Sequence, residues 1–202
     1  MYRFNFPFSF GSCHLNNTFG SELFLENNTI FLIDQKEGLS LEFSKLVSMM
    51  DYTRVTTIRE IESLTVEELD FLYGEESNSI GMLLAHMISV ERAYQIFTFE
   101  NRDITDDDSS TLNPGLDLGN SARDQIKGNS IDFYLEQLAE TRNKTIETFK
   151  TLKDEWLFEQ MSFWDGLPTN NYFKWFHVFE DELNHRGQIR IIKKMINKPK
   201  GR

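Results

Sequence analysis

The most informative segment of this chain is Trp175-Phe176-His177-Val178-Phe179-Glu180-Asp181-Glu182-Leu183-Asn184-His185-Arg186-Gly187-Gln188-Ile189. Two of the four histidines of the chain lie in it, with Asp181 midway between them. Residues four apart lie one above the other on one face of an α-helix, so His177, Asp181 and His185 share a face if this segment is helical. An imidazole and a carboxylate one turn apart can bind the same divalent metal ion.

A third histidine, His86, lies in the middle of another apolar segment. Its neighbours there are Met82, Leu83, Leu84, Ala85, Met87 and Ile88. A histidine inside a core needs a polar partner, because a polar group buried without one is costly. Asp181 and His185 are the most economical partners, and three ligands from two packed helices would leave coordination positions open for chemistry. We therefore predict a metal site formed by His86, Asp181 and His185. A hydrogen-bonded His–Asp pair without a metal remains the alternative.

Two further residues of the last helix are candidates for lining this site. His177 lies two turns before His185 and could line the mouth of the site, although a rim or capping histidine has the same pattern. Gln188 lies one turn beyond His185 and could orient a bound water or a neighbouring helix.

Glu91 is close to His86 in the sequence but is not predicted to be a ligand. It lies five residues further on, which places it about 140° away around a helix. We expect it to be a structural partner of Arg186.

The last segment also carries the motif HRGQI at residues 185–189, with Asp181 four residues before its histidine. Together with a lone His86 in a Leu-rich helix and Glu91 five residues later, it resembles the DinB-like, YfiT-like superfamily of four-helix-bundle, metal-dependent proteins. The resemblance covers roughly residues 43–198. It implies three histidine ligands, one on the second helix and two on the fourth, in an HxxxHRGQ pattern.

This chain departs from that pattern at one ligand, because Asp181 stands where the superfamily has the first histidine of the fourth helix. The resulting set of His86, Asp181 and His185 suits Zn, Ni, Mn or Fe(II), and its oxygen ligand disfavours the softest metals.

The resemblance also implies a range of functions. Characterised relatives include S-transferases and isomerases that use low-molecular-weight thiols such as bacillithiol or mycothiol, and the metal would activate the thiol. A metal-dependent hydrolase is a neighbouring possibility. A third is a non-catalytic, metal-stabilised bundle that binds a small ligand or a partner in a stress response. The superfamily further implies a homodimer.

The composition of the chain indicates which kinds of binding partner to expect. The chain has 202 residues, enough for one domain with a good core. Its net charge of −11 argues against nucleic acid or an anionic membrane as a partner. One cysteine excludes a disulfide framework and fits a reducing compartment. With no apolar run of membrane-spanning length and no signal-peptide pattern, we expect a cytoplasmic protein that acts on a small molecule.

Residues 1–40 differ from the rest and are predicted as a separate N-terminal extension, with the bundle at 41–202. Phe4, Phe6, Phe8 and Phe10 alternate, which predicts a short strand without a pairing partner. The extension is either poorly ordered or untranslated. The second hypothesis rests on residues 36–38, which can be encoded as the ribosome-binding sequence AAGGAGG, followed by a possible TTG start at Leu41.

Apolar periodicity predicts an all-α fold, a four-helix bundle with a long crossover connection between its second and third helices. The four helices are expected at about 43–64, from Ser77 or Ser79 to 99, at 130–152 and at 171–196. Thr65 is expected to cap a short turn after the first. The connection, 101–129, is expected to be an acidic loop with a turn at Asn113-Pro114-Gly115. It would let the second and third helices run parallel.

Overall fold

Four long helices make up the body of the protein. The computed structural model describes residues 30–162 and 166–197, and the predicted strand at residues 4–10 lies outside them. The long helices are α2 (Leu41–Ile61), α4 (Ile80–Phe99), α7 (Ile131–Phe149) and α9 (Asn171–Ile196). The predicted all-α four-helix bundle is confirmed, with helix limits that agree to within three residues.

Each long helix begins directly after a capping side chain. Ser40, Ser79, Ser130 and Asn170 accept a hydrogen bond from the backbone N–H three residues further on, at the start of α2, α4, α7 and α9 respectively. Such a bond satisfies one of the backbone donors that a helix start leaves unpaired. Local sequence therefore fixes where all four helices start.

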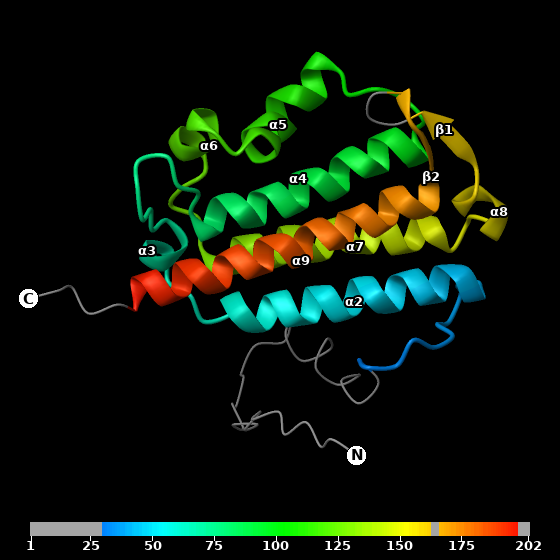
Figure 1. Cartoon of the computed structure of the whole chain (residues 1–202), viewed down its shortest axis with the longest axis horizontal. Coiled ribbons are helices and arrows are strands. Elements are labelled where there is room, and N and C mark those ends of the chain that lie inside the picture. Colours follow the sequence, from blue (N-terminus) through cyan, green and yellow to red (C-terminus); the bar gives the residue numbers. More distant parts are fainter. Residues whose placement is uncertain (1–29, 163–165, 198–202) are drawn as a thin grey trace, which may run out of the picture. The chain divides into compact units, whose positions relative to one another are not determined.

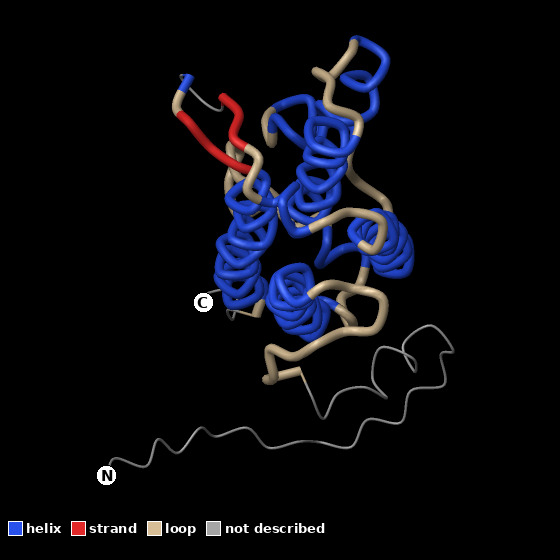
Figure 2. The backbone as a smooth tube through the Cα atoms, turned by 90° about the vertical axis from the view of Figure 1, so that its right-hand side faces the viewer, coloured by secondary structure: helices blue, strands red, loops and turns tan. Residues whose placement is uncertain are grey.

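The helices form a ring in the order α2, α9, α4, α7 (Figures 1 and 2). Figure 1 shows that α4 and α7 run in the same direction, opposite to α2 and α9. The predicted crossover between the second and third long helices is thus confirmed. The arrangement makes α4 and α9 antiparallel neighbours, which brings the two segments with the candidate ligands side by side.

The crossover connection itself differs from the prediction. It contains α5 (Asp106–Asp117) and α6 (Asn120–Gln125), and α5 packs along the outside of α4. The expected acidic loop and Asn-Pro-Gly turn are wrong, because Pro114 and Gly115 lie inside α5. Thr105 and Asp108 form a capping box, and the acidic residues 106–108 suit the positive end of the helix dipole.

Two short helices and a pair of short strands accompany the long helices. The predicted cap Thr65 starts α3 (Val66–Leu69) through a capping box with Glu68. Between α7 and α9, α8 (Asp154–Leu157) leads into an antiparallel pair of strands, β1 (Gln160–Ser162) and β2 (Pro168–Asn170).

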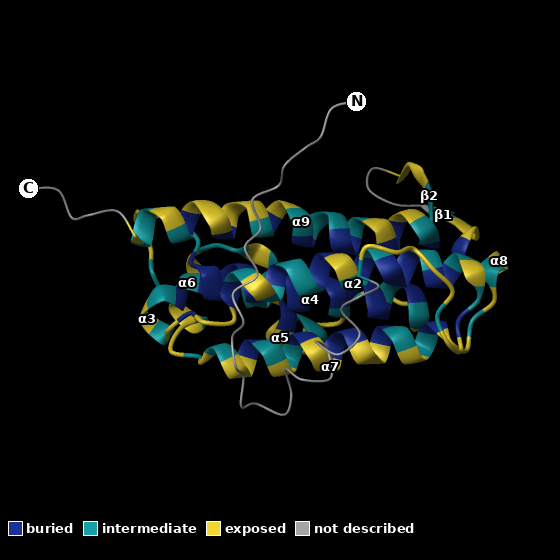
Figure 3. Ribbon diagram, turned by 90° about the horizontal axis from the view of Figure 1, so that it is seen from below, coloured by how far each residue is buried: buried dark blue, intermediate teal, exposed yellow. Residues whose placement is uncertain are grey.

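The apolar core falls into two clusters along the bundle, and the buried faces of the long helices point inward (Figure 3). One cluster is aromatic and includes Phe43, Phe149 and Trp175. The other is largely aliphatic and includes Leu83 and Ile189. Leu39 is buried in the first cluster, so the residues directly before Leu41 contribute to the bundle.

Candidate metal centre

Three side chains from two helices converge at the interface of α4 and α9. His86 comes from α4, and Asp181 and His185 come from α9. Each offers one donor atom, and these atoms all lie within 4.8 Å of one another. The two imidazole rings lie edge to face, with their centroids 4.7 Å apart. The structure thus brings together the three residues that were predicted as ligands.

The spacing of the donor atoms fits coordination better than hydrogen bonding. His86 Nε2 lies 3.6 Å from Asp181 Oδ2, and His185 Nε2 lies 3.4 Å from Asp181 Oδ1. Both distances are longer than ordinary N–H···O hydrogen bonds. Metal–ligand bonds of 2.0–2.2 Å in a tetrahedral site place neighbouring donors about 3.3–3.6 Å apart. The two His–carboxylate separations are therefore close to those of ligands around one ion, although each histidine faces a different oxygen of Asp181.

Two atoms of this cluster are buried without a hydrogen-bond partner. They are Asp181 Oδ2 and His185 Nδ1. A buried polar atom in a native protein is normally hydrogen-bonded, so an exception at a cluster of metal-ligating residue types points to something the chain itself does not supply. A divalent cation would satisfy the carboxylate oxygen, and the residues present therefore fit such an ion.

The carboxylate of Asp181 is ionised in this environment. Burial acts to raise its pKa, but the neighbouring imidazoles of His185 and His86 outweigh burial and hold the pKa well below its ordinary value. Burial and charge also oppose each other at His86: burial would lower the pKa of its imidazole, but the carboxylate of Asp181 raises that pKa above the ordinary value. A proton on His86 therefore competes with a cation for this site.

The backbone of α5 orients His86. Its Nδ1 lies 2.8 Å from the carbonyl oxygen of Gly115, which can only accept a hydrogen bond. Nδ1 therefore donates, and Nε2 is the nitrogen that faces Asp181. A ligating histidine generally makes such a bond with its second nitrogen.

The two predicted lining residues lie on the same helix as the triad. His177 Nδ1 is 3.0 Å from Glu180 Oε2, and its ring meets Tyr94 at a centroid distance of 5.9 Å. Gln188 is exposed, one turn beyond His185. Neither residue contributes a donor atom to the cluster, and both lie on the face of α9 that carries Asp181.

Tyr94 is a neighbour of the site that the sequence pattern did not single out. Burial raises the pKa of its hydroxyl, and the negative charge of Asp181 raises it further. Tyr94 lies two turns after His86 on α4, so the same four-residue spacing that linked Asp181 to His185 could have identified it.

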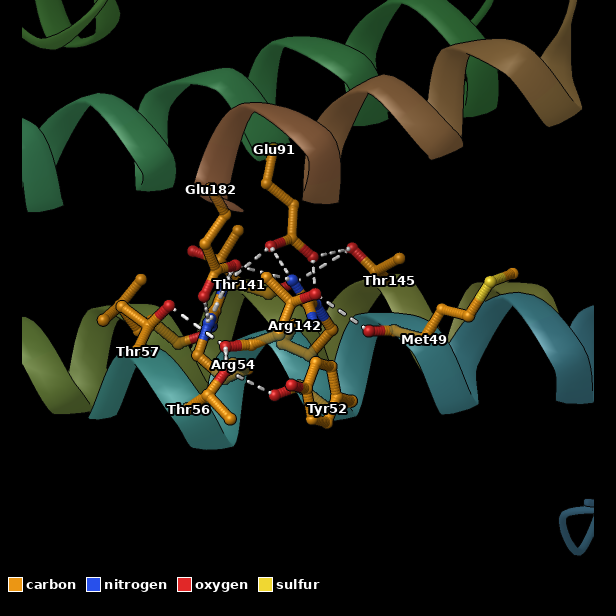
Figure 4. A network of polar contacts seen from close by, with 12 residues as sticks. Met49, Tyr52, Arg54, Thr56, Thr57, Glu91, Thr141, Arg142, Thr145 and Glu182 are labelled. Carbon is orange, nitrogen blue, oxygen red and sulfur yellow. Dashed lines mark hydrogen bonds and ion pairs between the residues drawn. The ribbon is translucent and has the colours of Figure 1, made fainter. Parts of the chain in front are cut away.

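The predicted pairing of Glu91 with Arg186 is wrong. Glu91 instead lies in a buried network with Arg54, Arg142 and Glu182, between the two apolar clusters (Figure 4). Arg186 donates to the hydroxyl of Thr56 on α2. The partners of Glu91 come from α2 and α7, helices that no local spacing relates to α4.

A crossover four-helix bundle with a His–carboxylate–His cluster between its second and last long helices has the architecture of the DinB-like proteins. Comparison with protein families agrees: the model of the MST family, described as mycothiol S-transferase, matches residues 45–198, and this chain belongs to that family. No curated protein matches the chain. Among the described helices, none has the length and apolarity needed to cross a bilayer.

Proposed function

We propose that this protein is a metal-dependent S-transferase that joins a low-molecular-weight thiol to a small electrophile. The reaction would form a bond between the thiol sulfur and an electrophilic carbon, and release the thiol proton and any leaving group to solvent. The observation that carries the proposal is the convergence of three donor atoms at a carboxylate whose oxygen Oδ2 is buried without a hydrogen-bond partner. Membership of the mycothiol S-transferase family suggests mycothiol or a related thiol as co-substrate.

His86, Asp181 and His185 would hold the ion. A divalent ion at such a site lowers the pKa of a bound thiol or water and so makes it a nucleophile near neutral pH. Three protein ligands leave a coordination position for that group. Zn, Ni, Mn and Fe(II) all suit two imidazoles and a carboxylate.

The chain's own residues would do the rest. The Gly115 carbonyl holds the ring of His86, and Asp181 contributes one negative charge that offsets half the charge of a divalent ion. Tyr94 and His177, in ring contact beside Asp181, would border the space for the reacting groups. The expected homodimer and cytoplasmic location stay predictions.

The test is metal content followed by turnover. Protein purified without a metal-affinity column should contain about one divalent ion per chain, and His86→Ala and Asp181→Ala should lose it. The metal-loaded protein should then conjugate thiols to electrophiles from a panel, and the metal-free protein should not. Turnover with metal but without thiol would indicate a hydrolase instead.

A second candidate is a metal-stabilised bundle that binds a ligand or partner without turnover. One observation favours it: the side chains of His86, Asp181 and His185 are only 10–18% exposed, so little of the cluster is open to a substrate. A stoichiometric ion with no turnover of any electrophile, with or without thiol, would support this function over the first.

A further inference from the structure

Helix α5 touches α4 most closely at Gly115. Gly115 is buried, and a methyl group in place of its hydrogen would lie 2.8 Å from the carbonyl oxygen of Ala85 and 2.9 Å from Cβ of Ser89, with Ser89 Oγ closer still. The first of these neighbours is backbone and cannot move aside as a flexible side chain can. Any side chain at position 115 would therefore displace α5 from α4.

The same residue presents its carbonyl to His86. Gly115 lies in the last turn of α5, where the final four carbonyl groups of a helix have no partner within the helix. His86 Nδ1 fills this position at 2.8 Å. His86 Nε2 faces Asp181 Oδ2 at 3.6 Å, which is beyond hydrogen-bond range. When the ring is neutral, its single proton is thus better placed on Nδ1 than on Nε2.

We propose that Gly115 is a positioning residue for the candidate metal centre. Its carbonyl keeps the proton of His86 on Nδ1 and so aims Nε2 at Asp181, and its missing side chain is what lets α5 come close enough to do this. The inference rests on the proposed function for the role of the metal, but the orientation of His86 is a property of the metal-free chain.

Helix α5 is consequently more than a connection. The capping box of Thr105 and Asp108 starts it, and the buried side chain of Leu112 anchors it one turn before Gly115. Any substitution that loosens α5 should therefore alter the orientation of His86, because the carbonyl of Gly115 holds its ring.

The direct test is the tautomer of His86 in metal-free, ¹⁵N-labelled full-length protein, measured by long-range ¹H–¹⁵N NMR at alkaline pH, where the imidazole is neutral. In the wild type we expect the proton on Nδ1. In Gly115→Ala the two tautomers should become mixed. Leu112→Ala, which loosens α5 without adding a clash, should shift the population in the same direction and is the variant to use if Gly115→Ala folds poorly.

Two matched glycines serve as controls. Gly187→Ala lies two residues from His185 in open space. It should leave the tautomer undisturbed and should not lower stability, since Ala favours a helix more than Gly does. Gly81→Ala lies on α4 itself, where its methyl group would meet the Tyr134 hydroxyl at 2.7 Å. It should destabilise the bundle but leave the His86 tautomer as in the wild type, which separates positioning from general packing.

Metal affinity, measured by competition with a chelator, gives the second readout. Loss of a hydrogen bond that orients a ligand typically lowers metal affinity about 10–100-fold, and we expect this for Gly115→Ala and no change for Gly187→Ala. A wild-type proton on Nε2, or an unchanged tautomer in both α5 variants, would overturn the inference. Wild-type protein with the Nδ1 proton but no bound ion would overturn the proposed function alone.

Discussion

The bundle holds two groups of buried ionisable side chains that differ in how fully their carboxylates are paired. In the closed network, Arg54, Glu91, Arg142 and Glu182 balance two positive against two negative charges, and every carboxylate oxygen has a guanidinium partner. In the open triad of His86, Asp181 and His185, the separations are 3.4–3.6 Å and two atoms have no partner. The carboxylate oxygens of the first group are all paired within the chain, and only Arg142 Nη1 there is buried without a partner, whereas in the second group a carboxylate oxygen itself has no hydrogen-bond donor.

The difference separates a structural role from a binding role for residues of the same type. Glu182 and Asp181 are adjacent in the sequence, yet Glu182 points to the closed network and Asp181 to the open triad. Burial alone does not distinguish them, since both carboxylates are largely enclosed. What distinguishes them is whether the surrounding chain supplies enough donors.

The largest expected effect comes from unbalancing the closed network. Glu91→Gln leaves Arg54 and Arg142 buried with one carboxylate fewer, and removing one partner of a buried ion pair costs about 3–5 kcal/mol. Chemical denaturation should show that loss in the free energy of unfolding. The control is Glu140→Gln, an exposed carboxylate 3.9 Å from Arg92, which should change stability by less than about 0.5 kcal/mol. Equal effects would contradict the distinction between the two sites.

Breaking the open triad should instead affect metal binding. Asp181→Ala removes a proposed ligand and should lower metal affinity by more than about 100-fold, since loss of an outer-shell partner alone costs up to that much. The unfolding free energy of the metal-free protein should change much less than in Glu91→Gln. Asp181→His, which restores the superfamily's ligand, is the matched control and should retain metal. Metal content and denaturation of the same samples decide this.

These two groups also show which contacts could be predicted from the sequence and which could not. Local spacing identified Asp181 and His185, because residues four apart on a helix are neighbours in any fold. His86 followed from the rule that a core histidine needs a partner. The closed network did not follow, because Arg54 and Arg142 meet Glu91 only through the packing of three helices. Gly115 was mistaken for part of a turn, since the Asn-Pro-Gly signal is local and the packing of α5 on α4 overrides it.

The pH dependence of stability should differ in sign with and without metal. Without metal, Asp181 raises the pKa of His86, so this pair stabilises the fold below the ordinary histidine pKa of about 6.5 and the stabilisation is lost as the pH rises through the folded-state pKa. With metal the imidazole must be neutral, so affinity should fall about tenfold per pH unit below that pKa. Thermal melts across pH, with metal and with chelator, test this. Parallel curves would exclude His86 as a ligand.

The smallest effect is expected for Thr145→Val, which removes one of the hydrogen bonds to Glu91 in the closed network. The hydroxyl of Thr145 donates to Glu91 Oε1 at 2.8 Å, and the same oxygen also accepts from Arg142 Nε. Thr145→Val keeps the shape of the side chain and leaves that oxygen with its guanidinium partner. It also removes an acceptor of Gln95 Nε2, which still donates to the carbonyl of Thr141. We therefore expect a loss of only about 0.5–1.5 kcal/mol.

Thr148→Val on the same helix is the control for this last variant, because its hydroxyl bonds only to the backbone carbonyl of Lys144 near the surface. It should be close to neutral in denaturation experiments. Metal affinity should be unchanged in both variants, since neither residue touches the triad. A loss of metal in Thr145→Val alone would mean that the closed network and the open triad are energetically coupled through α4, and that the division between a structural and a binding group is too sharp.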